Sequence, residues 1–89
     1  MDKHLNIRAW GRVQGVFFRQ TTRERARKLE LTGFARNEPD GSVYIEVEGA
    51  EENLQTFLEF CKRGPFLARV KSVEIIEGSL KNFSDFHIS

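Results

Sequence analysis

The sequence has few residues that could carry out covalent or metal chemistry. Its single cysteine, Cys61, cannot form a disulfide within the chain. Because Leu67, not arginine, stands six residues after that cysteine, the loop of a cysteine phosphatase is excluded. The two histidines, His4 and His87, lie near opposite ends of the chain, and no set of His and Cys has the spacing of a metal site. A metal centre and a phosphohistidine site are therefore not expected.

The sequence also lacks a long apolar run and a strong excess of one charge. No apolar stretch approaches the length of a membrane span, and residues 1–5 lack the apolar core of a secretory signal. The chain has 14 Lys and Arg against 13 Asp and Glu, so the net charge indicates no polyanionic partner. We expect a cytoplasmic monomer that binds neither membranes nor nucleic acid.

The composition is that of one small folded domain. The chain has 89 residues, of which 39% are hydrophobic and eight are phenylalanine, enough for one core over residues 1–89. Residues 8–28 contain seven Lys and Arg and one acid, whereas residues 38–59 contain seven acids and no Lys or Arg. This asymmetry is consistent with a positive approach to an anion site. It is equally consistent with a basic helix over an acidic sheet edge, or with a solvated face.

Hydrophobic periodicity predicts an alternation of strands and helices. The first half is expected to form a strand over residues 4–10, a loop over 11–18, a helix over 19–31 ended by Thr32-Gly33, and a short strand over 34–37. A turn over 38–41 leads to a strand over 43–48. The second helix has Leu54, Phe57, Leu58 and Cys61 on one face and ends at Gly64-Pro65, and it is followed by a strand over 69–77 and a short edge strand within 83–88. This order is the α+β, ferredoxin-like βαββαβ pattern, in which two helices cover one face of an antiparallel sheet.

The loop over residues 11–18 is the most informative segment. Gly11 and Gly15 bracket it, and Arg19 follows where the helix is expected to begin. A loop that enters a helix directs unpaired backbone N–H groups and the positive end of the helix dipole toward one point. With a guanidinium beside them, these donors suit a phosphate or another small oxyanion. The glycine spacing matches neither the P-loop nor the dinucleotide fingerprint, so no nucleotide cofactor is expected.

Asn37 is expected at the end of the second strand, close to this loop. A site made of amides and a guanidinium contains no strong acid or base, but it can orient water and stabilise negative charge. Such a site is sufficient where the leaving group departs unaided, as a carboxylate does with a parent-acid pKa of about 4. The residues therefore favour mixed anhydrides of carboxylic and phosphoric acids over ordinary phosphate esters as substrates.

Two segments carry a resemblance to a known family. The stretches Gly11-Arg12-Val13-Gln14-Gly15-Val16-Phe17-Phe18-Arg19 and Gly33-Phe34-Ala35-Arg36-Asn37-Glu38-Pro39-Asp40-Gly41-Ser42-Val43 resemble the two signatures of the acylphosphatases. The stretch over residues 64–70 and the late Phe86-His87-Ile88 are similar as well.

The resemblance implies a metal-independent hydrolase of acyl phosphates that releases inorganic phosphate and needs no cofactor. It implies that Arg19 binds the substrate phosphate and that Asn37 orients the attacking water. The backbone N–H groups that would hold the phosphate belong to Gln14, Gly15, Val16, Phe17, Phe18 and Arg19. The side chains of Phe17 and Phe18 are expected to pack in the core or within the loop.

Two other functions are known for domains of this fold class. Nucleic-acid-binding domains of the same fold carry aromatic residues on the sheet surface, especially in the third strand. Here Tyr44, Glu46 and Glu48 are expected on that surface, and two acids would repel a phosphate backbone. The remaining alternative is a non-catalytic anion-binding or regulatory ferredoxin-like domain, since one fold can serve several functions.

Overall fold

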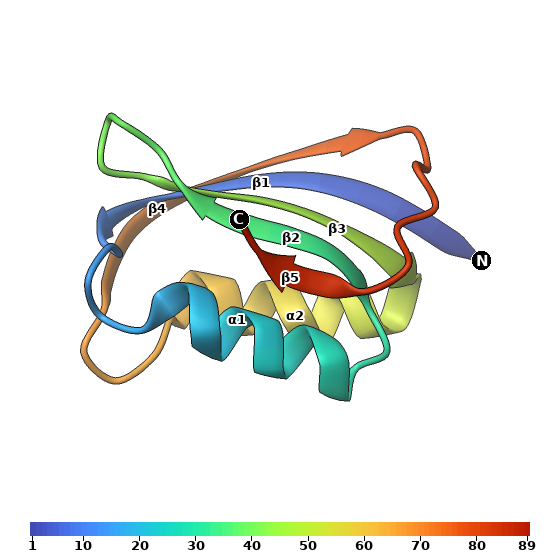
Figure 1. Ribbon diagram of the computed structural model, residues 1–89, viewed down its shortest axis with the longest axis horizontal. Helices are drawn as coiled ribbons and strands as arrows, with labels where there is room; N and C mark the ends of the chain where they lie inside the picture. Colours follow the sequence, from blue (N-terminus) through green and yellow to red (C-terminus); the bar gives the residue numbers. More distant parts are fainter.

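The computed structural model describes residues 1–89 as one sheet covered on one face by two helices (Figure 1). Along the chain the elements are β1 (Asp2–Arg12), α1 (Phe18–Lys28), β2 (Thr32–Asn37), β3 (Val43–Ala50), α2 (Glu51–Arg63), β4 (Arg69–Gly78) and β5 (Phe86–Ile88). This order and the two layers confirm the predicted ferredoxin-like α+β fold. Neither helix combines the length and the apolar character that a membrane crossing requires.

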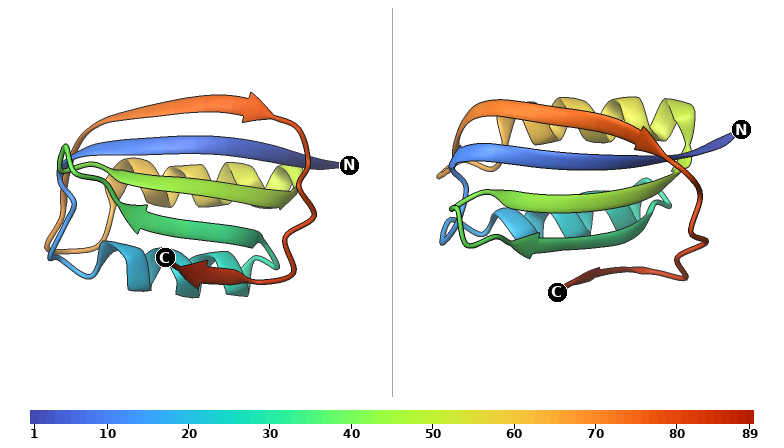
Figure 2. Two further views of the ribbon diagram at one scale, coloured as in Figure 1. Left: turned by 45° about the horizontal axis from the view of Figure 1, so that its top comes forward. Right: turned by 90° about the horizontal axis from the view of Figure 1, so that it is seen from above.

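The sheet is mixed, whereas the sequence predicted an antiparallel one. Its strand order is β4-β1-β3-β2-β5, and the pairs β4–β1, β1–β3 and β3–β2 are antiparallel. The last strand, β5, lies parallel to β2. The reason is visible in Figure 2: the chain reverses direction once after β4 and crosses the end of the sheet. Because β2 runs opposite to β4, the returning strand aligns with β2.

Helix α1 ends earlier than predicted. It stops at Lys28, and the Leu31 N–H donates to the Ala26 carbonyl at 2.8 Å in the turn that follows. Glu30 takes the left-handed conformation there with φ of 56°, a role that the prediction gave to Gly33. Gly33 lies within β2 instead. A Cβ at that position would stand 1.8 Å from the Glu46 carbonyl oxygen, so the close approach of β3 requires glycine.

The core lies between the sheet and the helices, as the periodicity predicted. Leu5, Ile7 and Ala9 of β1 are 8%, 0% and 0% exposed. They face the apolar sides of both helices in one cluster of 19 buried residues. Cys61 is fully buried in this cluster, and burial raises the pKa of its thiol. The cysteine is therefore a packing residue and not a nucleophile.

The opposite face of the sheet is partly covered, which the sequence did not predict. Glu46 and Glu48 of β3 were expected at the surface, but they are only 7% and 5% exposed. The segment between β4 and β5 lies over them: Lys81 Nζ stands 2.7 Å from Glu46, and the Asn82 N–H donates to Glu48 at 2.9 Å. His4 reaches Glu48 at 2.7 Å from the other side. These carboxylates hold the crossing segment on the sheet.

The substitution Glu48→Gln is expected to lower the free energy of unfolding by about 2 kcal/mol near neutral pH, because hydrogen bonds to a buried charge are lost. Burial alone would raise the pKa of the Glu48 carboxyl, but hydrogen bonds from Lys81 and its neighbours outweigh burial and hold the pKa below 4.5. A carboxyl whose pKa is lowered by folding stabilises the protein at pH values above its pKa in the unfolded chain. That stability is lost as the pH falls through its pKa in the folded protein.

Urea unfolding at several pH values measures this difference. The difference in unfolding free energy between the two proteins should have its full value above about pH 5. It should decrease as the pH falls below the ordinary carboxyl pKa. Glu59→Gln on the exposed surface of α2 is the control and should change little at any pH. A gap that stays constant at acid pH would contradict this account of Glu48.

Candidate functional site

The connection from β1 to α1 presents a run of unused backbone donors. The backbone N–H groups from Gly15 to Gln20 donate to no acceptor in the protein. The first N–H of this region that does so is that of Thr21, which donates to the Phe17 carbonyl at 3.1 Å. The first N–H groups of every helix lack an intrahelical acceptor, and here the free donors continue into the loop before the helix, so this region can bind an acceptor such as an anion.

The electrostatics of this connection favour an anion. Helix α1 begins at Phe18, one residue before the predicted start, and its first turn contains no acidic residue. The positive end of the helix dipole is therefore not neutralised by a carboxylate. Arg19 adds a full positive charge at the second position of the helix. A cation there is unfavourable for the helix itself, which indicates a role outside helix stability.

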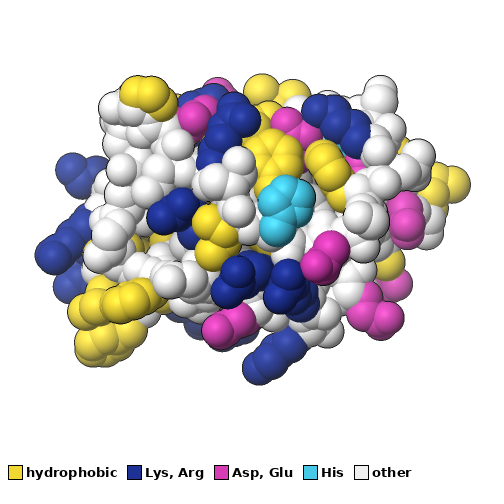
Figure 3. Space-filling view, viewed as in Figure 1, with side chains coloured by type: hydrophobic (Ala, Val, Ile, Leu, Met, Phe, Trp, Pro, Cys, Tyr) yellow, Lys and Arg dark blue, Asp and Glu magenta, His cyan; other side chains and the backbone are white.

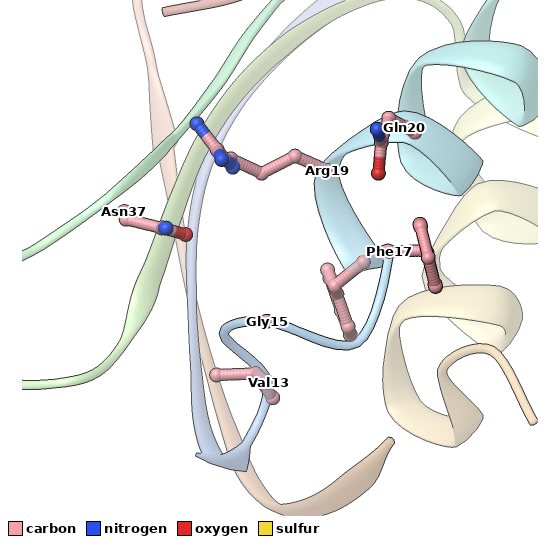
Figure 4. A pocket seen from close by; sticks show the side chains of 7 residues that line it. Val13, Gly15, Phe17, Arg19, Gln20 and Asn37 are labelled. Carbon is pink, nitrogen blue, oxygen red and sulfur yellow. The ribbon is translucent and has the colours of Figure 1, made fainter. Parts of the chain in front are cut away.

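A pocket lies at this connection. Seven residues line it: Val13, Gly15, Phe17, Phe18, Arg19, Gln20 and Asn37. Figure 4 shows the side chains of Arg19 and Asn37 reaching over the same hollow, one from α1 and the other from the end of β2. The fold thus brings together residues that are far apart in the sequence.

Two residues of the expected phosphate-holding loop do not line the pocket. Val16 is 4% exposed and belongs to the core. Gln14 turns its side chain toward the turn between β2 and β3, where its Nε2 donates to the carbonyls of Glu38 and Ser42 at 2.8 and 2.9 Å. Because Glu38 follows Asn37 directly, this bridge fixes the loop relative to Asn37. Nothing in the local sequence pattern indicated that contact.

The expectation for the two neighbouring phenylalanines is half correct. Phe18 is 1% exposed and packs in the core. Phe17 is 63% exposed, so the expected burial of its side chain in the core or loop is wrong. The reason is the left-handed conformation of Phe17 at the start of α1, with φ of 62° and ψ of 21°. The two side chains consequently leave the chain in different directions.

The Arg19 side chain is held between α1 and the end of the chain's last strand. It is half-buried, and its Nη1 donates to the carbonyl oxygen of Ser89 at 3.3 Å. A guanidinium has five N–H donors, so this single contact leaves most of them available. The residue that follows β5 therefore orients the Arg19 side chain and leaves most of its N–H donors free.

Asn37 is exposed at the end of β2, next to a braced turn. The Asp40 carboxylate accepts hydrogen bonds from the hydroxyl and the backbone N–H of Ser42 at 2.6 and 2.9 Å. These bonds lower the pKa of Asp40 below its ordinary value. Arg8 lies 3.4 Å from Glu38 in the same turn. A turn held at several points gives Asn37 a defined position over the pocket.

Four of the six other basic residues of the 8–28 stretch have a structural role. Arg8 pairs with the turn before β3, and Arg27 pairs with Asp85 at 3.1 Å. Three basic residues of α1 lie in its last turn, where the helix dipole favours them: Arg25, Arg27 and Lys28. For these residues, structural contacts within the protein explain the excess of positive charge better than a role in attracting an anion does. Arg19 alone among them lines the pocket.

The pocket can hold an anion and orient a water, but it has no acid or base of its own. None of its lining residues is Asp, Glu, His or Cys. No group of three or more such residues anywhere in the structure could hold a metal ion. The available chemistry is the stabilisation of negative charge by N–H groups and a guanidinium, with an amide as donor and acceptor toward water.

The substitution Gly15→Ala tests whether ligand approach needs this glycine. Gly15 has φ of 70° and Gly41 has φ of 92°, and a Cβ at either position meets nothing within 4 Å. Alanine at either position should cost about 1 kcal/mol of stability through backbone strain. Only the change at Gly15, which lines the pocket, should weaken the binding of inorganic phosphate, by about tenfold. Calorimetric titration with phosphate measures it; equal affinities for the two variants would remove Gly15 from the site.

The chain is similar to known proteins over most of its length. The family model for acylphosphatases matches residues 5–88. An acylphosphatase of Salinibacter ruber is 49% identical over 74 residues, which are 83% of this chain and 78% of that protein. The crystal structure of acylphosphatase from Bacillus subtilis has a TM-score of 0.95 and 38% identity, and the match covers 100% of this chain and 99% of that one.

A larger protein contains a similar fold. The crystal structure of full-length HypF in the phosphate- and nucleotide-bound form matches 100% of this chain with only 12% of its own, at a TM-score of 0.90 and 30% identity. The family model, by comparison, spans all of this chain except its first four residues and its last one. On that match and on the identity to the relatives above, this chain belongs to the acylphosphatase family.

Proposed function

We propose that the protein hydrolyses acyl phosphates to a carboxylate and inorganic phosphate. One observation carries the proposal: a single pocket without acid or base is lined by Arg19, by Asn37 and by the loop and helix residues whose N–H groups are unpaired, namely Gly15, Phe17, Phe18, Arg19 and Gln20. Membership of the acylphosphatase family supports the same reaction, as do relatives that bear that name. The pocket chemistry suits a substrate whose leaving group needs no protonation.

In this proposal the phosphoryl group of the substrate occupies the pocket. Its oxygens accept hydrogen bonds from the free N–H groups at the start of α1, and Arg19 donates two charge-assisted bonds. These donors are already oriented before the ligand arrives, because the loop is tied down through Gln14. Oriented donors stabilise the charge that gathers on the phosphoryl oxygens in the transition state at little further cost.

Asn37 orients the attacking water. The water oxygen forms a bond to phosphorus while the bond from phosphorus to the acyl oxygen breaks, so the carboxylate leaves with that electron pair. One proton of the water passes to an oxygen of the substrate's own phosphoryl group. The products are a carboxylate and dihydrogen phosphate, and no protein group changes its protonation state. The low basicity of the leaving carboxylate, with a parent-acid pKa of about 4, makes a general acid unnecessary.

We propose further that the reaction needs no metal ion and that residues 1–89 act as a single monomeric domain on small-molecule substrates. Acetyl phosphate and benzoyl phosphate, incubated with the protein in isotope-labelled water, test both the activity and the bond that breaks. Phosphate release should be the same with and without a chelator, and the label should appear in phosphate. Loss of activity with chelator would overturn metal independence, and label in the carboxylate would overturn attack at phosphorus.

The second candidate is a non-catalytic anion-binding domain. It is favoured by one observation: the pocket has donors for an anion but no acid or base among its lining residues. A domain of that kind would bind inorganic phosphate but would leave acyl phosphates intact. The same incubation separates the two candidates, because binding without turnover supports the second and overturns the first.

A further inference from the structure

Two aromatic side chains remain in solvent at the end of the molecule that carries the pocket. Phe17 lines the pocket and is 63% exposed, and Phe66 in the connection from α2 to β4 is 93% exposed. Its neighbour Leu67 is 52% exposed. Figure 3 shows hydrophobic side chains gathered at this end of the molecule. We call Phe17, Phe66 and Leu67 the apolar rim.

The two connections that carry the apolar rim run beside each other. Arg12, the last residue of β1, is the register partner of Arg69, the first residue of β4. At the other end, a Cβ on Gly64 would stand 3.2 Å from the Phe18 side chain. Both ends of one connection are thus anchored on the other, and Figures 1 and 2 show the two loops side by side.

Neither burial nor backbone conformation explains an aromatic residue at position 17. Its ring is outside the core, so it adds little to the stability that burial provides. Its positive φ of 62° is a conformation that bulky residues rarely adopt and that glycine adopts without strain. An exposed aromatic residue that lines a pocket in an unfavourable conformation is a candidate for contact with a ligand.

The geometry of the proposed reaction directs the acyl group toward the apolar rim. In phosphoryl transfer the attacking oxygen and the leaving oxygen lie roughly in line on opposite sides of phosphorus. Figure 4 shows Asn37 on one side of the loop that carries Gly15, and Phe17 on the other side of it. If Asn37 holds the water, the acyl group leaves on the side of Phe17.

We infer that the apolar rim binds the acyl group of the substrate, so that this protein prefers acyl phosphates with an aromatic or other large apolar acyl group. The inference rests on the proposed function and adds the substrate class to it. Phe17 and Phe66 provide ring surfaces against which such a group packs, while Arg19 and the loop amides hold its phosphoryl end. A small acyl group such as acetyl reaches neither ring and gains nothing from them.

The experiment compares kcat/KM for benzoyl phosphate and acetyl phosphate in four proteins: the unchanged chain, Phe17→Ala, Phe66→Ala and Ile76→Ala. The last variant is the control, because Ile76 is 56% exposed on β4 away from the pocket. The ratio of the two values is the readout, since general damage to the phosphate site lowers both equally. Both phenylalanine variants should lower the ratio by about three- to tenfold, the range for the loss of one aromatic contact.

An unchanged ratio in either phenylalanine variant would overturn the assignment of that residue, and an unchanged ratio in both would overturn the inference while hydrolysis stands. A fall in the ratio for Ile76→Ala would overturn it as well. If Phe66→Ala dissolves a dimer seen by sedimentation and leaves the ratio unchanged, the rim belongs to a second copy of the chain. Failure of the unchanged protein to hydrolyse either substrate would overturn the proposed function itself.

Discussion

Arg19→Ala is expected to lower kcat/KM for acetyl phosphate by about 10³-fold, the upper range for removal of one preorganised donor from a transition-state site. Arg19 is the only cationic side chain that lines the pocket. Its loss removes a charge and a planar pair of donors together. The same substitution should abolish the rise in melting temperature that inorganic phosphate produces by binding the folded state. Steady-state kinetics and thermal unfolding with added phosphate measure the two effects.

Two further variants control for charge and for the integrity of the helix. Arg23→Ala removes a half-buried arginine one turn further along α1, outside the pocket, and should change neither quantity by more than about twofold. Arg19→Lys keeps the charge but not the forked donors, and should recover only part of the activity. Equal losses in Arg19→Ala and Arg23→Ala would assign the effect to the general positive field of α1 and remove Arg19 from its proposed role.

Asn37→Ala is expected to lower kcat by about 10²-fold or more while leaving the affinity for inorganic phosphate within about threefold. Asn37 lies across the pocket from the free N–H groups, at the end of a different element. If it holds the water and not the phosphate, its loss removes an interaction made only on the reaction path. Turnover kinetics and phosphate titration, measured on the same preparation, separate the two.

Asn37→Asp provides the matching control, because it keeps the size of the side chain and adds a negative charge. That charge should repel the phosphoryl group, so this variant should lose phosphate affinity as well as turnover. If Asn37→Ala loses phosphate affinity to the same extent as Asn37→Asp, the amide binds phosphate directly, and the assignment of Asn37 to water would be wrong.

The elements that local pattern determines were predictable from the sequence. Alternation in β1 and the apolar stripe of α2 reflect burial on one side, and every residue predicted on these two buried faces is buried. His4 and Phe60 are buried as well, which the patterns did not predict. The loop before α1 was predictable for a similar reason, because the two glycines and the following helix are local features. From these elements the arrangement that brings Asn37 near Arg19 followed by topology, and the pocket contains both.

Contacts between distant segments were not predictable. The burial of Glu46 and Glu48 depends on Lys81 and its neighbours crossing the sheet, and no periodicity within β3 records that crossing. The parallel pairing of β5 follows from the same crossing. The bridge from Gln14 to the turn after β2 is likewise a contact between segments more than twenty residues apart. In each case the two partners lie far apart in the sequence, and only the folded chain brings them together.

The end of α1 shows a different reason for error. Gly33 follows the helical stripe, and glycine commonly ends helices, so the prediction placed the helix end there. The glycine is required instead because β3 approaches it closely, and Glu30 adopts the left-handed conformation that ends the helix. One residue type serves both purposes, and the sequence alone does not distinguish them.

The central claim is that the N–H groups at the start of α1 form a phosphate site with Arg19. Titration of inorganic phosphate into the protein, followed by backbone amide NMR signals, tests it most directly. The account predicts saturable shifts that are largest from Gly15 to Gln20, and that vanish in Arg19→Ala. Shifts confined to the basic last turn of α1, at Arg25, Arg27 and Lys28, or shifts that never saturate, would contradict it.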